Sequence, residues 1–327
     1  MDNLTGLDTL SLLAIPLAFI VGFALRRGSV CMVEGAKQAV VNRRGLRLRA
    51  YAVAAAAAGF VVLPLSWVLP GTGMLAPDFP PTWTIVLGGA LFGLGARING
   101  GCQFGTLARL AGGELDFAVT CIAGAAVAVL MPQVLLPAAP RASVLETPTL
   151  AGVLVLALFL ALAAPALRRR YWRNLRRALT SRTAVLSPIP GMLVVGTVGG
   201  VLYAVAGSWT VGALLNREGA WLLGDAASHA DIKAIAGGAA LLAGAVYAAL
   251  WTGKFRLRAP TIGALTHHLP GGMLMGAGAA MIPGGNGTLL LYAMPSASAS
   301  AWIAFVAMTA MIVLTFLPLR ARRAAAR

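Results

Sequence analysis

The sequence has 327 residues, of which 59% are hydrophobic and only 11% are charged, and its net charge is +16. Soluble proteins carry roughly 25% charged residues, so this chain has too few charged side chains to cover a water-exposed surface. Several apolar stretches approach the roughly 20 residues that span a bilayer. They continue to the C-terminus, which excludes a secretory signal followed by a soluble domain. We therefore expect a membrane protein.

Apolar stretches recur along the whole chain, separated by basic segments or by loops rich in proline and glycine. The predicted spans are residues 10–25, 50–69, 83–111, 117–136, 149–167, 189–205, 235–251, 260–294 and 300–319. A short helical piece is expected at 32–41. Another is expected to end near Asn216, before a mixed polar loop at 217–233. Two of the spans, 83–111 and 260–294, contain features that predict an interruption.

The span at 83–111 contains the sequence GGALFGLGARINGGCQFGT, from Gly88 to Thr106. It is too rich in glycine for an ordinary membrane-spanning helix and too apolar for an ordinary loop. We expect two half-helices, at about 83–98 and 103–111, with a break between them. The residues at this break are Gly100, Gly101, Cys102 and Gln103.

A weaker copy of this stretch lies 183 residues later, from Gly271 to Thr288. Its predicted break contains Gly284, Gly285 and Asn286, and upstream of the two breaks Gly28-Ser29 corresponds loosely to Gly207-Ser208. Paired, glycine-interrupted segments are typical of transport sites near the bilayer midplane. The alternative is that these glycines only pack helices together. Against it, non-helical backbone at membrane depth persists only where it is buried or lines a cavity.

The basic residues form clusters between the apolar stretches, at 43–49, 168–182, 254–258 and 320–327. This is the pattern of cytoplasmic loops rather than of a nucleic-acid-binding face. Placing these clusters on one side puts the N-terminus outside and the C-terminus in the cytoplasm. The first repeat, residues 1–136, then begins on the outer side of the membrane, and the second repeat, 189–327, begins on the inner side. Residues 137–188 supply a connecting span and a basic linker. The expected fold is an all-α polytopic membrane protein with two inverted-topology repeats, whose broken helices meet at a central pore.

The predicted breaks offer chemistry that suits an anion. Unpaired backbone N–H groups and the positive ends of helix dipoles both favour negative charge. Cys102 lies at the first break and Cys31 follows the first span, and their thiols suit soft sulfur ligands. Arg97 is an intramembrane charge, which makes it a candidate site residue; it could instead pair with Glu114 or Asp116.

Other reactive side chains are expected to have ordinary roles. Cys121 fits the environment of a small buried hydrophobic residue. His267 and His268 are expected to lie in a loop or to cap a helix. No metal-binding or phosphate-binding motif is present, so neither a metal nor another cofactor is expected.

The sequence resembles the YeeE/YedE membrane-protein family, whose characterised members are thiosulfate-uptake permeases. The resemblance rests on Gly22–Cys31 (GFALRRGSVC), on Gly95–Gly105 (GARINGGCQFG), and on Gly276-Ala277-Gly278 leading to Pro283–Gly287 (PGGNG). It covers nearly the whole chain. It implies an inner-membrane permease that takes up a small sulfur-containing anion, most simply thiosulfate. It further implies contact with membrane lipid and a small cytoplasmic sulfur-carrier protein as a partner.

The resemblance also implies a line of three cysteines along which thiosulfate is passed by S–H hydrogen bonds. Cys31 and Cys102 match the first two positions. At the third, where the family has Gly-Cys-Asn, this chain has Gly284-Gly285-Asn286. Three readings remain open: a sulfur-anion permease, a membrane-embedded sulfur-transfer enzyme acting through Cys31 and Cys102, and a structural membrane subunit.

Overall fold

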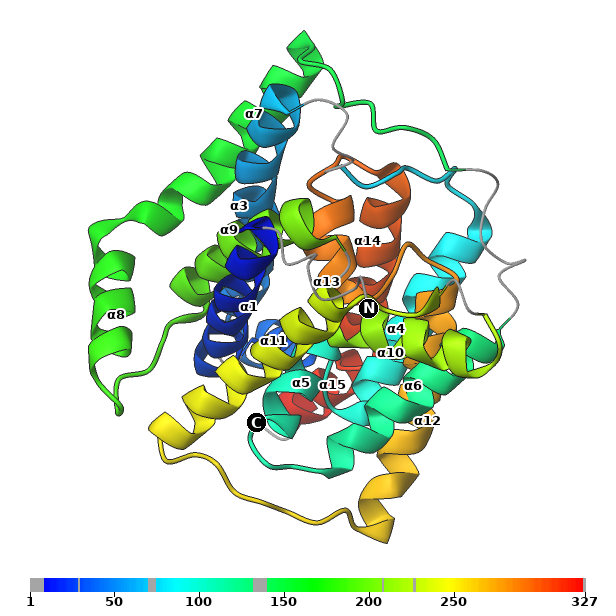
Figure 1. Cartoon of the computed structure of the whole chain (residues 1–327). Helices are drawn as coiled ribbons and strands as arrows, with labels where there is room; N and C mark the ends of the chain where they lie inside the picture. Colours follow the sequence, from blue (N-terminus) through cyan, green and yellow to red (C-terminus); the bar gives the residue numbers. More distant parts are fainter. Residues whose placement is uncertain are drawn as a thin grey trace.

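The computed structural model describes residues 9–28, 30–69, 75–131, 140–207, 209–225 and 228–325, and within these ranges it contains helices and no strand. Figure 1 shows them as one helical bundle. The longer helices are α1 (Thr9–Gly28), α3 (Leu46–Val68), α4 (Trp83–Asn99), α6 (Asp116–Leu130), α7 (Leu150–Ala163), α9 (Pro188–Ala206), α11 (Ile232–Trp251), α12 (Ile262–Ala280) and α14 (Ala299–Leu314). The shorter ones are α2 (Met32–Asn42), α5 (Gln103–Leu110), η2 (Ala164–Leu167), α8 (Arg169–Thr180), α10 (Val211–Leu222), α13 (Asn286–Thr288), η4 (Leu289–Ala293) and α15 (Leu317–Ala325).

Seven helical stretches of the described chain are long and apolar enough to cross a membrane, so this is an all-α polytopic membrane protein. They are Leu13–Asn42, Leu46–Val68, Trp83–Leu110, Leu150–Leu167, Pro188–Leu222, Ala234–Trp251 and Ala299–Ala321. The predicted span at 117–136 is shorter in the structure, where α6 has 15 residues. In the predicted span at 260–294, α12 ends at Ala280 and includes His267, His268 and Pro270, which lower its apolar character. Residues 1–8, which are predicted to lie on the external side of the membrane, are not among the described residues.

Two helix pairs join the halves of the chain through close backbone contacts. In the pair α1 and α11, a Cβ added to Gly244 would lie 2.0 Å from the carbonyl oxygen of Phe19. In the pair α3 and α9, a Cβ added to Gly196 would lie 2.3 Å from the carbonyl oxygen of Ala54. Small residues allow helix backbones to approach this closely in membranes. The first half is therefore interleaved with the second rather than lying beside it (Figure 1).

The helices α4 and α12 pack against each other through the glycines of the two repeated motifs. Gly88 contacts Gly278, and Gly95 contacts Gly271, so the two helices run antiparallel. At the 183-residue offset, Gly271 is the counterpart of Gly88 and Gly278 that of Gly95. Gly88 thus contacts the counterpart of Gly95, and Gly95 contacts the counterpart of Gly88. A twofold relation between the motifs requires this arrangement. The repeat boundaries at 1–136 and 189–327 stay a prediction.

The helices α7 and α8 lie at the edge of the bundle (Figure 1). The basic helix α8 is held to the end of α1 by Arg27, whose guanidinium donates hydrogen bonds to the carbonyl oxygens of Ser181 (2.9 Å), Arg182 (3.3 Å) and Ala178. An arginine that caps the last carbonyls of a helix stabilises that end. The basic segment at 168–182 is thereby fixed to the end of α1.

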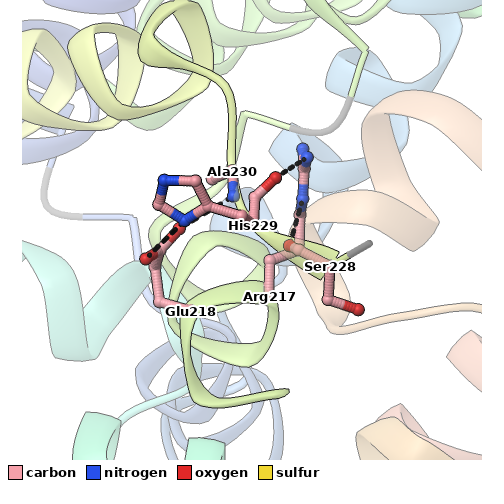
Figure 2. Close-up of polar contacts among 5 residues, drawn as sticks. All are labelled: Arg217, Glu218, Ser228, His229 and Ala230. Carbon is pink, nitrogen blue, oxygen red and sulfur yellow. Dashed lines mark hydrogen bonds and ion pairs between the residues drawn. The ribbon is translucent and has the colours of Figure 1, made fainter. Parts of the chain in front are cut away.

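The connection from α10 to α11 is held by a group of polar contacts (Figure 2). Arg217 donates to the carbonyl oxygens of Ser228 and His229 at 3.3 and 2.9 Å, while Glu218 accepts from the Ala230 amide at 2.8 Å and pairs with the His229 ring at 3.3 Å. The expectation that this helix ends near Asn216 is wrong, since α10 continues to Leu222. Its polar side chains bind the following loop, and this fixes the direction of α10.

Candidate functional site

The first helix break lies at Gly100, Gly101 and Cys102, as predicted. Helix α4 ends at Asn99, and Gly100 has φ 74°, a left-handed conformation that glycine adopts without strain. The amide of Gly101 donates to the carbonyl oxygen of Ala96 at 3.1 Å. Cys102 is extended, with φ −74° and ψ 177°, and serves as the N-cap of α5. The helix is therefore interrupted over three residues, and a new helix N-terminus starts inside the bundle.

The second break repeats this local geometry without the thiol. After α12, Gly284 has φ 100°, and Gly285 has φ −68° and ψ 175° as the N-cap of α13. These dihedrals nearly equal those of Cys102, so Gly285 occupies the position that corresponds to the cysteine. The helix continues as a π-helix over Leu289–Ala293, a rare form that is found most often at functional sites.

The thiols of Cys31 and Cys102 meet at the first break. Cys31 is the N-cap of α2, and its thiol is a close neighbour of that of Cys102. The amide of Met32 donates to Cys102 Sγ at 3.3 Å, and the Tyr51 hydroxyl lies 3.6 Å from the same sulfur. A Cβ on Gly105 would come within 2.7 Å of Cys31 Sγ, so glycine makes room for that thiol. Two helix N-termini, those of α2 and α5, therefore converge on one pair of thiols.

Gln103 connects the two breaks. Its Oε1 accepts a hydrogen bond of 3.4 Å from the amide of Gly287 in α13. A Cβ added to Gly285 would lie 2.5 Å from the same Oε1, so the carboxamide fills the space of the missing side chain. The first residue of α5 thus binds the start of α13. The breaks, which lie far apart in sequence, form one site.

A cavity of about 310 Å³ opens beside this site. Its polar lining side chains are Gln103, Thr106, Thr120, Cys121, Thr210, Asn216 and Thr288. The first turn of α10 also lines it and adds the backbone N–H groups of a helix N-terminus, which attract anions. Within the described residues no charged side chain lines the cavity. It is a neutral chamber with hydrogen-bond donors and one thiol.

Cys31 and Cys102 do not line this cavity. Cys102 is fully buried, and the described lining includes the next two residues, Gln103 and Phe104, but not the cysteine. Phe104 is itself only 4% exposed. Gln103 and Phe104, which follow Cys102 directly, therefore connect the cavity lining to the thiol pair along the chain.

A buried polar network holds the end of α4 at the first break. Asn99 Nδ2 donates to the carbonyl oxygen of Gly101 (2.7 Å) and to Thr106 Oγ1 (2.8 Å). Asn99 Oδ1 accepts from Thr120 Oγ1 (2.6 Å) and from His268 Nδ1 (2.7 Å). Since His268 is a buried residue of α12, the prediction that it lies in a loop or caps a helix is wrong. The network ties α4, α5, α6 and α12 together directly behind the cavity wall.

The remaining predicted site residues have separate positions. The guanidinium of Arg97 lies 4.6 Å from the ring centroid of Phe316, and within the described chain it forms no ion pair with Glu114 or Asp116. Asn286 is completely buried, and neither atom of its amide has a hydrogen-bond partner among the described residues. Ser29 and Ser208 lie outside the described residues. Within the described chain no three His, Cys, Asp or Glu side chains gather closely enough to hold a metal ion.

Comparison with known proteins decides the family. A family model described as sulphur transport matches residues 27–314, which include both helix breaks and both thiols of the first break. The chain belongs to the sulphur transport family. This is the YeeE/YedE family that the sequence resembles. No match was found among curated proteins.

Two residues of this sulphur transport protein were missed by sequence reasoning. Cys121 was expected to be a plain hydrophobic residue, but it lines the cavity. His268 was assigned no role at the break. Both come to the site because α6 packs against α12, where a Cβ on Gly276 would lie 2.1 Å from the carbonyl oxygen of Gly124. Nothing in the local sequence of either residue indicates that contact.

Proposed function

We propose that this member of the sulphur transport family is a permease for a small sulfur-containing anion, most simply thiosulfate. The observation that carries the proposal is the meeting of the two helix breaks at Gln103, with the Cys31–Cys102 thiol pair on one side and the cavity on the other. Non-helical backbone at membrane depth requires burial or a cavity, and this site has both.

The donors around the site match the two ends of thiosulfate. Its oxygens are hard acceptors that suit backbone N–H groups and the Gln103 amide, whereas its terminal sulfur is soft and suits the thiols. The unpaired amide of Asn286 is a further polar group without a partner, and such groups are rare in proteins unless something else binds them. With no charged side chain in the cavity lining, the ion is held weakly enough to leave again, as conduction requires.

The path we propose enters from outside, crosses the cavity and passes Gln103 and Phe104 to reach the thiol pair. The basic clusters place the C-terminus in the cytoplasm by the positive-inside rule, and the membrane is then the bacterial inner membrane. The basic helix α8, with Trp172 exposed, suits anionic lipid headgroups at that surface. A small cytoplasmic sulfur-carrier protein as the acceptor of the imported sulfur stays a prediction.

The direct test is uptake of thiosulfate that carries ³⁵S at its terminal sulfur, by cells that lack other thiosulfate and sulfate importers. Cells that express this protein should show saturable uptake, and unlabelled thiosulfate should compete. Sulfite, sulfate and the selenium analogue, added as competitors, then define the range of substrates. If none of these anions is taken up or binds to the purified protein, the permease proposal is wrong and a purely structural role remains.

One arrangement favours a second function, because the two thiols are close neighbours. In a sulfur-transfer enzyme, the thiolate of one cysteine attacks the terminal sulfur of thiosulfate. The S–S bond of thiosulfate breaks, sulfite leaves with its electron pair, and a persulfide remains on the cysteine. Mass spectrometry of the intact protein after exposure to thiosulfate distinguishes the two functions. A permease shows no added sulfur atom, whereas the enzyme shows one on Cys31 or Cys102.

Replacement of Gly285 by cysteine tests whether the second break lies on the path. The new Cβ displaces the Gln103 carboxamide, which is the flexible end of a side chain, and the thiol adds one weak hydrogen bond at the position equivalent to Cys102. At about 1 kcal/mol for such a bond, we expect roughly a fivefold gain in competition by thiosulfate relative to sulfate. The control is Gly285→Ala, which displaces Gln103 in the same way without adding a thiol. If both variants behave alike, the second break does not contact the sulfur of the ion.

A further inference from the structure

The hydrogen-bond network behind the cavity contains a titratable side chain, one of whose ring nitrogens is free to bind a proton. His268 Nδ1 faces Asn99 Oδ1 at 2.7 Å, and since an amide oxygen can only accept, Nδ1 carries the proton of this bond. The described residues supply no hydrogen bond to Nε2, and this atom is not among the enclosed polar atoms of the described chain. A second proton therefore binds at Nε2 without breaking the bond to Asn99.

The surroundings of His268 contain charges of both signs. Burial of the ring is the largest influence on its protonation and disfavours the charged form, whereas Asp116 and Glu114 favour it with negative charge and Arg109 and the neighbouring His267 disfavour it with positive charge. The Asp116 carboxylate also accepts a hydrogen bond of 2.9 Å from the Thr261 amide. These groups belong to α5, to the region where α6 starts and to α12 itself. The protonation of the ring therefore depends on solvent pH and on nearby charges of both signs.

The ring is also connected to the cavity. Thr120 Oγ1 donates to the Asn99 oxygen that accepts from His268, and it lies 3.3 Å from His268 Nδ1. Thr120 and Thr106, both partners of Asn99, line the cavity. The imidazole thus stands directly behind the cavity wall, separated from the interior by one threonine. The cavity has no charged lining side chain of its own, so a charge on His268 acts on an anion there with little competition.

We propose that His268 is a proton-binding site coupled to anion binding in this cavity. The inference rests on the proposed function. Protonation at Nε2 places a positive charge behind Thr120 and strengthens the Nδ1–H donor to Asn99. Because opposite charges attract, the anion binds more tightly when His268 is protonated. Linkage requires the converse as well: a bound anion increases the proton affinity of His268 by the same factor.

The affinity for the anion is expected to fall as pH rises. A histidine titrates near pH 6.5 in the absence of perturbation, whereas thiosulfate keeps its charge between pH 5.5 and 8. Affinity is therefore high at the acidic end of this range and falls as pH rises and His268 loses its proton. On the cytoplasmic side, where the basic loop before α12 is predicted to lie, deprotonation favours release of the ion. A coupling of about tenfold is ordinary for two linked sites.

The test is equilibrium binding of labelled thiosulfate to the purified full-length protein between pH 5.5 and 8. The wild type should show a Kd that rises about tenfold across this range. His268→Asn keeps an N–H donor near the Nδ1 position but cannot take up a proton. Its Kd should stay near the high-pH value of the wild type at every pH. His267→Asn removes one of the positive charges that act on the ring, so it should shift the midpoint of the profile slightly while the dependence of Kd on pH remains.

Two outcomes overturn the inference: a wild-type Kd that does not change with pH, or a His268→Asn profile that follows the wild type. A wild type that binds no sulfur anion at any pH overturns the proposed function as well. If His268→Asn does not fold, the wild type still gives an answer by NMR. The chain has only three histidines, and thiosulfate should raise the titration midpoint of His268. An unchanged midpoint in saturating thiosulfate contradicts the coupling.

Discussion

Replacement of Cys102 by alanine is expected to reduce thiosulfate uptake to background. The sulfur of Cys102 is the point at which the Cys31 thiol, the Met32 amide and the Tyr51 hydroxyl converge. Alanine removes the soft contact offered to the ion and leaves the Met32 amide, at the N-terminus of α2, without its partner. Loss of two such interactions, at about 1 kcal/mol each, corresponds to roughly a 30-fold loss of uptake. The measurement is initial uptake of ³⁵S-thiosulfate at equal amounts of protein in the membrane.

Two variants separate the loss of the thiol from a loss of folding. Cys102→Ser keeps a small hydrogen-bonding group at the N-cap of α5, so the protein should fold while uptake stays low, because oxygen is a hard ligand. Cys121→Ala removes a thiol of the cavity wall that takes no part in the Cys31–Cys102 contact, so most uptake should remain. Wild-type uptake by a folded Cys102→Ala variant would rule out a role for this thiol in the path.

The largest expected effect on stability is that of Gly244→Ala. Gly244 lies where α11 crosses α1, and an added Cβ would lie 2.0 Å from the Phe19 carbonyl oxygen. That atom belongs to the backbone of a helix, so it cannot move aside as the end of a flexible side chain can. The helices have to separate. Overpacking of this kind costs about 1–3 kcal/mol, and occasionally more. Thermal unfolding of the purified protein in detergent should show the loss.

The matched control lies on the same helix. A Cβ added to Gly237 meets no atom of the described residues within 4 Å, so Gly237→Ala should leave the packing unchanged. Alanine is a better helix former than glycine by about 1 kcal/mol, and this variant should unfold at a slightly higher temperature than the wild type. If the two variants have the same unfolding temperature, the close crossing of α1 and α11 does not limit stability.

Features encoded in local sequence were predictable. The first break was placed at Gly100–Cys102 because clustered glycines next to Asn99 cannot continue a helix at low cost, and Gly100 does adopt a positive φ. The match of Gly285 to Cys102 followed from the 183-residue offset, and the nearly equal dihedrals of the two N-caps agree with it. The basic segment at 168–182 was expected to be a linker, and it contains the helix α8.

Features created by contact between distant helices were not predictable from one sequence. The residues next to His268 and Cys121 in the chain do not indicate a site, and only the packing of α12 on α6 brings these two side chains to the break and the cavity. The length of α10 was underestimated for a related reason. Arg217 and Glu218 look like loop residues, but as helix residues they bind the backbone of the following connection (Figure 2).

The interleaved packing of the two halves limits how the molecule moves. A carrier that alternates between outward and inward states usually rocks one half against the other. Here that motion has to pull apart α1 from α11, α3 from α9 and α4 from α12, and each pair is in backbone contact through glycine. The hydrogen bond of Gln103 to Gly287 also joins the halves at the centre. On the path proposed above, rotation of the Gln103 and Phe104 side chains breaks the Gln103–Gly287 hydrogen bond but leaves the three helix pairs in place. We therefore expect a stiff frame with a small gate at these two side chains, so that their rotation, rather than a movement of the whole fold, sets the speed of transport.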